Sequence, residues 1–546
     1  MQEIILITLL LLVVGGATIV EPRLRVPSPL LLVLVGVAAS LIPGLGQIQT
    51  PPDLVLEGLL PPLLYASARV MPPMNFRREF RTISGLSVIL VVVTALLLGL
   101  LFQWLVPDLG FAWGAVLGAI VSPTDAAATA IVKRSSLPRR AIVMLDGESL
   151  LNDATALVLM RTGIAATAGA FSLIGSIGTF AYSVAVAVGL GLLVGWLDLA
   201  IRRRISNPTV NTILSFTVPF LASIPAELLD ASGLVAAVTA GLVGSLRAPR
   251  LLPPSHRLSE AQNWASLRMV LEGSIFLVMG LQLSSIVHDA NATSHSAVFA
   301  VELAAIAMGL MLAIRAGYVA PLLVALHRRA DRQKELQPRL SSFRDRLEDG
   351  KPIALPPRHR RLAWLFTPKR RDRLAKRAKT RLADIDYLAN EPLGWREGVI
   401  VVWAGMRGAV TVAAAQSLPT ETPHRPLLVL IAFAVAAISL LVQGSTLAPI
   451  VSQLYRGTAD QEDEGSADSD ERREITEMLH ATARQVEPRG EDESPEQHGI
   501  KVLEAQRDCL LDARDQGLFT PEGLSYALHA LDVQQIAWEM RQNPEI

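Results

Sequence analysis

Thirteen apolar stretches, each long enough to cross a lipid bilayer, recur along this chain of 546 residues. The hydrocarbon core of a bilayer is about 30 Å thick, and a helix needs about 20 apolar residues to span it. Because 51% of the residues are hydrophobic and 18% are charged, most of the chain is too apolar for a soluble domain. We therefore expect an all-α polytopic membrane protein, a bundle of about 13 transmembrane helices. The predicted spans run roughly over 3–20, 28–46, 53–70, 84–106, 111–133, 141–165, 173–201, 208–225, 231–247, 267–287, 297–327, 395–418 and 425–453.

The charges of the connecting loops predict how these spans are oriented. Basic loops alternate with loops such as PDLG and PAELLDA, which contain no Lys or Arg. Basic loops mark the cytoplasmic side, so we expect a multi-pass protein of the cell (inner) membrane with its N-terminus outside and its C-terminus in the cytoplasm. The alternative, a re-entrant or merged span, breaks this alternation. The basic set comprises Arg23 and Arg25, Arg69–Arg81, Lys133–Arg140, Arg202–Arg204, Arg247–Arg268 and the loop from Arg328.

Two polar segments accompany the spans. The predicted order is spans one to eleven over 1–327, a basic cytoplasmic loop over 328–394, spans twelve and thirteen over 395–453 and an acidic cytoplasmic tail over 454–546. Residues 328–390 contain 19 Lys and Arg against 8 Asp and Glu, whereas 456–546 contain 9 against 22. The loop suits an anionic lipid surface, with a solvated linker as the alternative. Because it is tethered at the membrane, we expect no nucleic acid partner.

The tail predicts a small helical module. Its acidic run over 459–471 is expected to lack structure, and helices are expected over 470–485, over 497–515 and after Thr520. We interpret it as regulatory. Cys509 is the single cysteine of the chain, which excludes an intrachain disulfide and a cysteine-rich metal site.

Carboxylates in the middle of spans five and six identify the candidate site. A charge at this depth is costly and by default functional. Asp125 lies midway along span five, and Asp153 lies midway along span six. Ser149 and Asn152 share one helical face with Asp153, so a hydroxyl, an amide and a carboxylate can supply oxygen ligands to a small hard cation. Taken singly, the hydroxyl or the amide is more often a helix-bonding or helix-packing group, but two carboxylates at one depth favour a site.

Proline and glycine predict interruptions in spans five and twelve. Pro123 removes a backbone donor and frees carbonyls, which makes the carbonyl of Thr124 a candidate ligand. Gly405 and Gly408 flank Arg407 in the middle of span twelve, where the helix is expected to unwind. Two interrupted helices of opposite direction in corresponding halves are typical of an inverted-repeat transporter. Asp125 or Arg407 would neutralise the partial charges of the half-helix ends.

A second arginine, Arg315, lies near the middle of span eleven. A buried guanidinium needs an anionic or carbonyl partner. We expect Glu148 of span six to pair with Arg315, which leaves Asp153 free for an ion.

Several segments in order resemble the monovalent cation:proton antiporter-1 family, which contains the bacterial NhaP-type and animal NHE-type sodium/proton exchangers. They are SPTDAAATA, DGESLLNDATALV, ASGLVAAVTAGL, IFLVMGLQL, GMRGAVTVAAA and LLVQGSTLAPI, and they cover about residues 1 to 453. The resemblance implies a homodimer without a cofactor, in which spans one to three and eight to ten form a scaffold. Spans four to six and eleven to thirteen would form the mobile core.

The resemblance also implies roles for individual residues. Asp153 is the expected carboxylate for cation or proton, with Asn152 as its partner. Thr124, Asp125 and Ser149 resemble the other ligands, so that Asp153, Ser149 and Thr124 would hold the transported Na⁺, and Glu148 and Arg315 resemble the structural ion pair of the core. The chain departs from the pattern at Ala66, where some members carry a glutamate, and at Gly273, where asparagine is common.

The predicted mechanism is competition of a proton and Na⁺, or Li⁺, for Asp153, followed by alternating access. A single exchanging carboxylate predicts electroneutral one-for-one antiport. The alternative within the fold is a K⁺/H⁺ antiporter. An intramembrane aspartyl protease using Asp125 and Asp153 is disfavoured because its GxGD motif is absent, and a channel is disfavoured because a buried carboxylate suits exchange better than rapid conduction.

Overall fold

The computed structural model describes residues 2–24, 26–42, 51–133, 137–168, 173–291, 297–348, 380–382, 384–385, 387, 393–456, 464–486, 488 and 494–542. Helices are the only regular elements of this described part, as the apolar periodicity predicts. The chain divides into two compact units, one formed by Met1–Ala320 with Arg396–Arg456 and the other by Pro321–Trp395 with Gly457–Ile546. Most of the predicted basic loop lies outside the described residues.

The first unit contains the membrane spans. Its helices are α1 (Gln2–Leu24), α2 (Ser28–Ser40), η1 (Leu54–Leu59), α3 (Leu60–Val70), α4 (Pro73–Ser84), η2 (Gly85–Ile89), α5 (Leu90–Leu105), η3 (Pro107–Leu109), α6 (Gly110–Val121), α7 (Ala127–Val132), α8 (Arg139–Ala168), α9 (Leu173–Arg202), α10 (Pro208–Leu228), α11 (Gly233–Leu251), α12 (Pro254–Leu281), α13 (Leu283–Asn291), most of α16 (Trp395–Trp403), α17 (Ala409–Gln416) and α18 (Arg425–Leu454). The helix α14 (Ala297–Glu348) begins in this unit and extends into the second.

Eight helical segments of the described residues are long and apolar enough to cross a membrane. Predicted span six falls on α8, whose hydropathy is lowered by the polar residues of the candidate site. Spans five and twelve are each split into two shorter helices. The polytopic helical fold is therefore confirmed, while the number of thirteen spans stays a prediction. Helix α14 continues as one helix to Glu348, so residues 328–348 of the predicted basic loop are helical.

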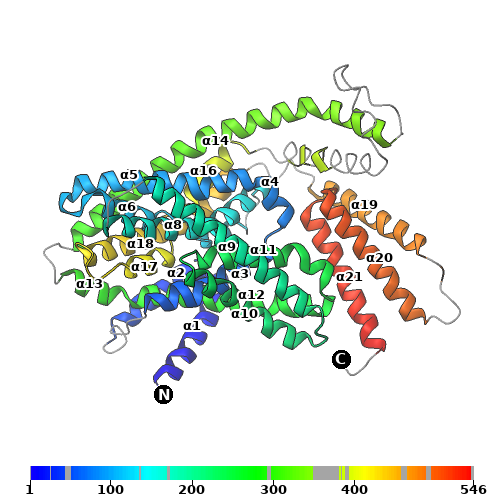
Figure 1. Ribbon diagram of the computed structural model, residues 1–546, viewed down its shortest axis with the longest axis horizontal. Coiled ribbons are helices and arrows are strands. Elements are labelled where there is room, and N and C mark those ends of the chain that lie inside the picture. Colours follow the sequence, from blue (N-terminus) through cyan, green and yellow to red (C-terminus); the bar gives the residue numbers. More distant parts are fainter. Residues whose placement is uncertain are drawn as a thin grey trace. The chain divides into compact units, whose positions relative to one another are not determined.

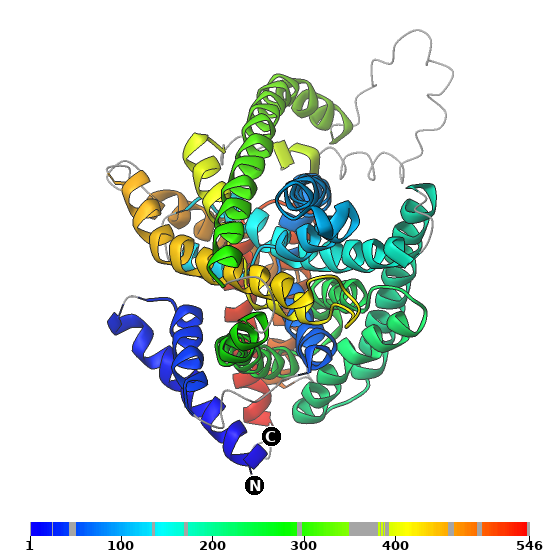
Figure 2. The ribbon, with the colours of Figure 1, turned by 90° about the vertical axis from the view of Figure 1, so that its left-hand side faces the viewer.

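The helices assigned to the scaffold pack closely against one another. Helix α2 lies on α12, α3 lies on α11, and α10 lies on α11 (Figure 2). Helix α9, which is predicted span seven and was assigned to neither group, packs against α10 and α11. Gly36 of α2 faces Gly280 of α12, and a Cβ built on Gly36 would approach the Gly280 Cα to 2.9 Å. Such glycine contacts allow helix backbones to approach without the apolar driving force that acts in water.

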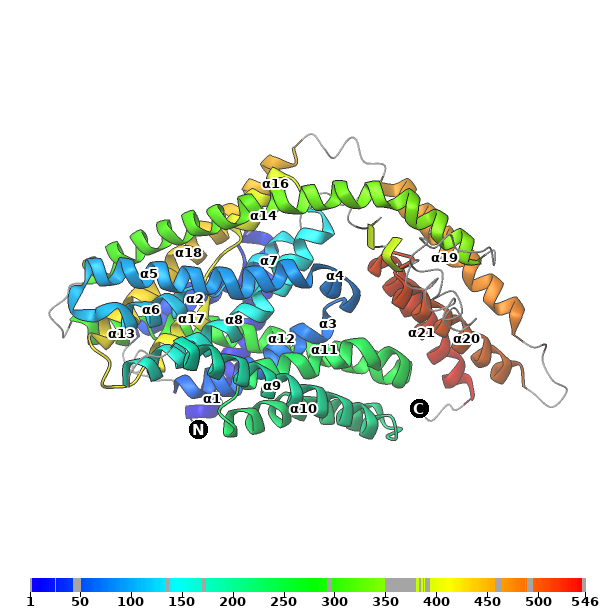
Figure 3. The same cartoon turned by 45° about the horizontal axis from the view of Figure 1, so that its top comes forward.

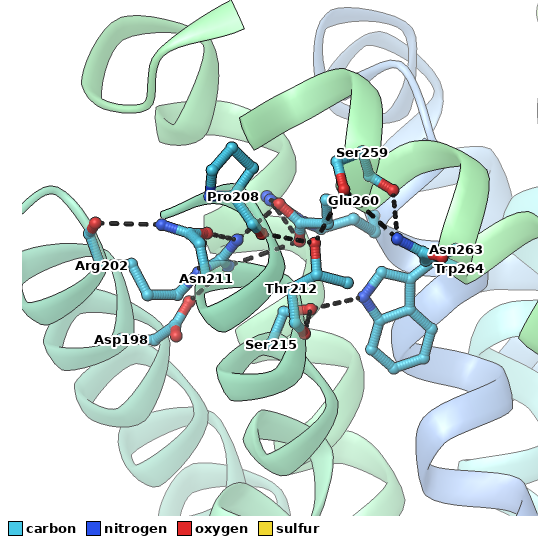
Figure 4. Close-up of polar contacts among 11 residues, drawn as sticks. Asp198, Arg202, Pro208, Asn211, Thr212, Ser215, Ser259, Glu260, Asn263 and Trp264 are labelled. Atoms are coloured by element: carbon cyan, nitrogen blue, oxygen red, sulfur yellow. Dashed lines mark hydrogen bonds and ion pairs between the residues drawn. The ribbon is translucent and has the colours of Figure 1, made fainter. Parts of the chain in front are cut away.

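A buried ion network joins the scaffold helices α3, α10 and α12 to α9, which is predicted span seven; Figure 4 shows the part of it on α9, α10 and α12. Glu260 of α12 accepts hydrogen bonds from Arg69 of α3, at 2.8 Å, and from Arg202 at the end of α9, at 2.7 Å. Asn211 of α10 accepts from the Arg202 Nε at 2.7 Å and donates to the Arg202 carbonyl oxygen at 3.0 Å. These side chains satisfy one another's charges and hydrogen bonds, as burial requires.

The core helices surround α8. Helices α5 and α6 run side by side (Figure 1), and α4, η2 and α5 continue one another as a helical segment of 33 residues. Glu79 of α4 forms a buried ion pair with Arg140 at the start of α8, at 2.5 Å. The helix that carries the candidate carboxylate is thus tied to its neighbour at one end.

The tail forms a bundle of α19 (Glu464–Gln485), α20 (Pro495–Gln516) and α21 (Pro521–Gln542), which lie side by side (Figure 3). Its apolar core is built from Ile475, Leu503, Leu510, Ala513, Leu524, Ala527 and Leu531. The carboxylate of Glu471 accepts from the Thr520 hydroxyl at 2.8 Å, which fixes the start of α21. The expectation that all of 459–471 lacks structure is wrong for 464–471, because acidic residues in a first helical turn stabilise the helix dipole.

Candidate functional site

Two interrupted helices meet in the membrane unit. Helix α6 ends at Val121 and α7 begins at Ala127, while α16 ends at Trp403 and α17 begins at Ala409. The non-helical segments contact one another directly, since the Asp125 backbone amide donates to the carbonyl oxygen of Met406 at 2.7 Å. The predicted breaks at Pro123 and at the glycines beside Arg407 therefore lie where the two non-helical segments cross.

Opposite charges lie at the ends of these half-helices. The Asp125 carboxylate accepts from the amide of Ala127 at 3.1 Å, at the positive end of α7. The same carboxylate lies against Gly408 at the start of α17, where a Cβ would overlap it. Arg407 donates through Nε to the carbonyl oxygen of Val121 at 3.1 Å, at the negative end of α6, and through its guanidinium to Gly405 beyond α16.

A serine of α18 holds the interruption from behind. Ser439 is fully buried. Its hydroxyl accepts a hydrogen bond from the Arg407 amide at 2.8 Å and lies 3.1 Å from the Arg407 carbonyl oxygen, to which it can donate. The sequence pattern did not identify this residue. The available signal was a lone hydroxyl in an otherwise apolar run, AVAAISLLV, which does not reveal which neighbour it faces.

The polar side chains of α8 form a connected network with the first interruption. The Asn152 side-chain amide donates to the Thr124 hydroxyl at 2.6 Å, and that hydroxyl donates to Glu148 at 3.3 Å. Glu148 forms a bidentate ion pair with Arg315 of α14, with one N–O distance of 2.8 Å. Arg315 also donates through Nε to the carbonyl oxygen of Val401 in α16, at 2.9 Å. One arginine thus joins α8, α14 and α16.

Asp153 differs from every other charged side chain at this crossing. It is 7% exposed, and it makes no hydrogen bond or ion pair with any described residue. Asp125 is close enough to interact with it electrostatically. A buried carboxylate without a compensating partner is costly, and a proton or a bound cation removes that cost.

Further oxygen atoms of α8 and of the first interruption are incompletely bonded. The Asn152 side-chain oxygen is buried without a hydrogen-bond partner among the described residues. The Thr124 carbonyl oxygen is reached only by the Asn152 amide, at 3.5 Å. Ser149 donates to the Asp146 carbonyl oxygen at 3.1 Å, which leaves its own oxygen able to accept or to coordinate. Oxygen groups of this kind suit small hard cations.

A small cavity adjoins the network. It has room for about one water molecule, and its polar lining is Thr94, Ser122, Glu148, Asn152, Arg315 and Arg407. Asp153 is outside this lining, so the cavity adjoins the ion-pair side of α8 and not the unpaired carboxylate.

Packing explains the two departures from the family pattern. Ala66 is 1% exposed in the apolar scaffold core with Tyr65 and Trp264. A Cβ at Gly273 would meet the side chain of Val14 at 2.7 Å. Neither position offers a ligand, so the candidate ligands come from α8 and from the first interruption.

A polytopic helical bundle with two crossed, interrupted helices and a buried carboxylate is typical of a secondary transporter. The family model described as sodium/hydrogen exchanger, transmembrane, matches residues 7–453. The chain therefore belongs to the sodium/hydrogen exchanger family, which confirms the resemblance found in the motifs. This is a family of transporters and not of enzymes, so the aspartyl protease alternative is abandoned.

Individual relatives agree with this assignment. An uncharacterized Na⁺/H⁺ exchanger of Mycobacterium tuberculosis is 31% identical over 459 residues, which cover 82% of this chain and 74% of the relative. A sodium, potassium, lithium and rubidium/H⁺ antiporter of Bacillus pumilus is 28% identical over 298 residues, which cover 52% of this chain and 44% of the relative. The solved structure of the sodium proton antiporter MjNhaP1 from Methanocaldococcus jannaschii covers 84% of this chain and all of its own, with a TM-score of 0.55 and 17% identity, a likeness of fold.

Proposed function

We propose that this protein exchanges Na⁺ for H⁺ across the cell membrane and that both ions bind at Asp153. The single observation that carries the assignment is the state of this carboxylate, which is buried and unpaired. Glu148, Arg315, Asp125 and Arg407 are all engaged with partners at the same crossing. Asp153 is the charge that remains available for a transported ion.

Burial makes the two ions compete. A bare carboxylate is unfavourable in this surrounding, and either a proton or Na⁺ neutralises it. Ser149, the Thr124 carbonyl and the Asn152 oxygen would complete the Na⁺ coordination, with Asp125 adding negative charge nearby. Only a neutralised site crosses the membrane barrier at low cost, so the core moves when Asp153 carries one ion or the other. With one such carboxylate, the exchange is electroneutral.

The surrounding charges keep the site in shape. Asp125 and Arg407 offset the partial charges of the four half-helix ends, which would otherwise face one another in a medium of low dielectric constant. The Glu148–Arg315 pair joins three helices and, because it is already neutral, leaves the charge of the site to Asp153.

K⁺ is the second candidate cation. The Bacillus pumilus relative is named as an antiporter for sodium, potassium, lithium and rubidium, so a broad alkali cation preference exists among similar proteins. Ser149, Asn152 and the Thr124 carbonyl are ligand types that accept either ion, which leaves the choice to the size of the coordinated cavity.

The loop charges and the family support a proposal for the location and the assembly. The protein is a multi-pass membrane protein, and the alternation of basic loops supports a cytoplasmic C-terminus in the cell membrane. We include in the proposal a homodimer formed through the scaffold helices, in contact with membrane lipid.

Ion exchange in proteoliposomes tests the proposal. Na⁺, Li⁺ and K⁺ gradients are imposed at several pH values, and internal pH is followed for the wild type and for Asp153→Asn. Asp146→Asn is the matched control, because Asp146 lies on the same helix but pairs with Lys133 at the surface, at 2.8 Å. We expect the control to exchange and Asp153→Asn to be inactive. Wild-type exchange in Asp153→Asn would refute the site.

A further inference from the structure

The outer face of α4 carries two arginines one helical turn apart. Arg77 and Arg81 are both exposed, and neither has a partner among the described residues. Like charges four residues apart on a helix repel each other. An anion placed between them would remove that repulsion and bind both guanidinium groups.

Phe80 gives this face an apolar component. Its side chain is 49% exposed, and its ring packs edge-on against Phe76 with a centroid distance of 5.6 Å. Residues 77, 80 and 81 lie on one side of the helix. Basic side chains beside an exposed Phe ring suit the boundary between headgroups and acyl chains.

Helix length places this face at headgroup depth. The segment Pro73–Leu105 contains 33 residues, which at 1.5 Å per residue is about 50 Å, against about 30 Å for the hydrocarbon core. The apolar part, from Gly85 to Leu105, is long enough to fill that core. Arg81 and Arg77 then lie about 6 and 12 Å beyond its edge, within reach of lipid phosphate.

The opposite face of α4 is fixed to the protein. Glu79 is 1% exposed and forms its ion pair with Arg140 at 2.5 Å, and Asn75 and Thr82 are also buried on that side. The helix therefore cannot rotate to hide its arginines without breaking a buried ion pair. The orientation of the exposed face is therefore fixed, and this face is directed away from the core helices.

We propose that this face binds an anionic phospholipid, with Arg77 and Arg81 on the phosphate and Phe80 against the upper acyl chain. The depth and the aromatic ring favour lipid over the acidic tail of the same chain, which would satisfy the arginines but leave Phe80 exposed. Because α4 is tied through Glu79 to the helix that carries Asp153, the bound lipid anchors the core at the membrane surface.

Thermal unfolding of the full chain in detergent tests this surface. Phosphatidylglycerol and phosphatidylcholine with the same acyl chains are titrated separately, since a ligand of the folded state raises the melting temperature. We expect phosphatidylglycerol to raise it more. Arg77→Gln with Arg81→Gln should weaken the apparent affinity about thirtyfold, from about fivefold per arginine. Arg77→Lys with Arg81→Lys should retain most of the response, because both charges remain.

The matched control removes two exposed arginines of another basic loop, Arg203→Gln with Arg204→Gln, and should respond as the wild type does. The proposal is overturned if the Arg77 and Arg81 double glutamine variant also responds as the wild type does. An equal rise with inorganic phosphate would instead identify a free-anion site. Absence of any phosphatidylglycerol effect on the wild type, as expected if the acidic tail occupies this face, also overturns it.

Discussion

Replacing Arg315 by leucine leaves the buried carboxylate of Glu148 without its ion-pair partner. The side chains of Arg315 and Glu148 are 3% and 2% exposed, and the arginine also donates to the Val401 carbonyl oxygen. After the change, Glu148 keeps only the Thr124 hydroxyl at 3.3 Å. Breaking a buried pair from one side costs about 3–5 kcal/mol, because the remaining charge is uncompensated.

The double variant Glu148→Gln with Arg315→Leu separates the cost of the unpaired carboxylate from the loss of the other arginine contacts. It removes the stranded carboxylate, so we expect it to be more stable than Arg315→Leu alone, a non-additive result typical of contacting residues. Lys133→Gln is the control, since its pair with Asp146 has 48% and 29% exposed side chains and is worth less than about 1 kcal/mol.

Unfolding in detergent measures these differences, and vesicle exchange measures their effect on transport. The expected order of stability is wild type close to Lys133→Gln, then the double variant, then Arg315→Leu. If Arg315→Leu were no less stable than Lys133→Gln, or if the double variant were the least stable of the four proteins, the reasoning on the buried pair would be refuted.

Three further outcomes are expected. Gly408→Ala forces a Cβ into the Asp125 carboxylate and should abolish exchange. Gly309→Ala, with open space around it, should leave exchange intact. Equal activity of the two variants would contradict the close contact between Asp125 and Gly408. Ser439→Ala removes the support of the Arg407 backbone and should lower stability by about 1–3 kcal/mol, measured by unfolding; an unchanged midpoint argues against that support. Lowering pH should raise the KM for Na⁺ without changing the maximal rate, as competition requires, and a pH-independent KM in vesicles would exclude a shared carboxylate.

The residues with strong local signals were predictable from the sequence. Pro123 and the glycines around Arg407 indicated the interruptions because they act on their own backbone. Arg315 required an anion at its depth, and Glu148 was the available one. These inferences depend on chemistry that is independent of the exact packing of the helices.

The contacts that depend on tertiary approach were not predictable. The carbonyl oxygens of Val121 and Met406 are bonded only because two chain breaks cross, and the side of α18 that carries Ser439 faces that crossing. The environment of the loop arginines was also not predictable from the sequence. Arg69, Arg140 and Arg202 were assigned to the cytoplasmic basic set, yet all three form ion pairs with Glu260 or Glu79, and Arg140 and Arg202 are buried. Counting charges along a chain does not distinguish such pairs from solvated arginines.

Calorimetry of Na⁺ binding tests the central claim most directly. If Na⁺ displaces a proton from Asp153, binding to the detergent-solubilised protein releases about one proton per Na⁺ at a pH where that carboxylate is protonated, because a cation and a proton cannot share it. The heat then varies with the ionisation enthalpy of the buffer. We predict this behaviour for the wild type and for Asp146→Asn, and no Na⁺ binding for Asp153→Asn. Na⁺ binding without proton release, or binding that survives in Asp153→Asn, would contradict the account.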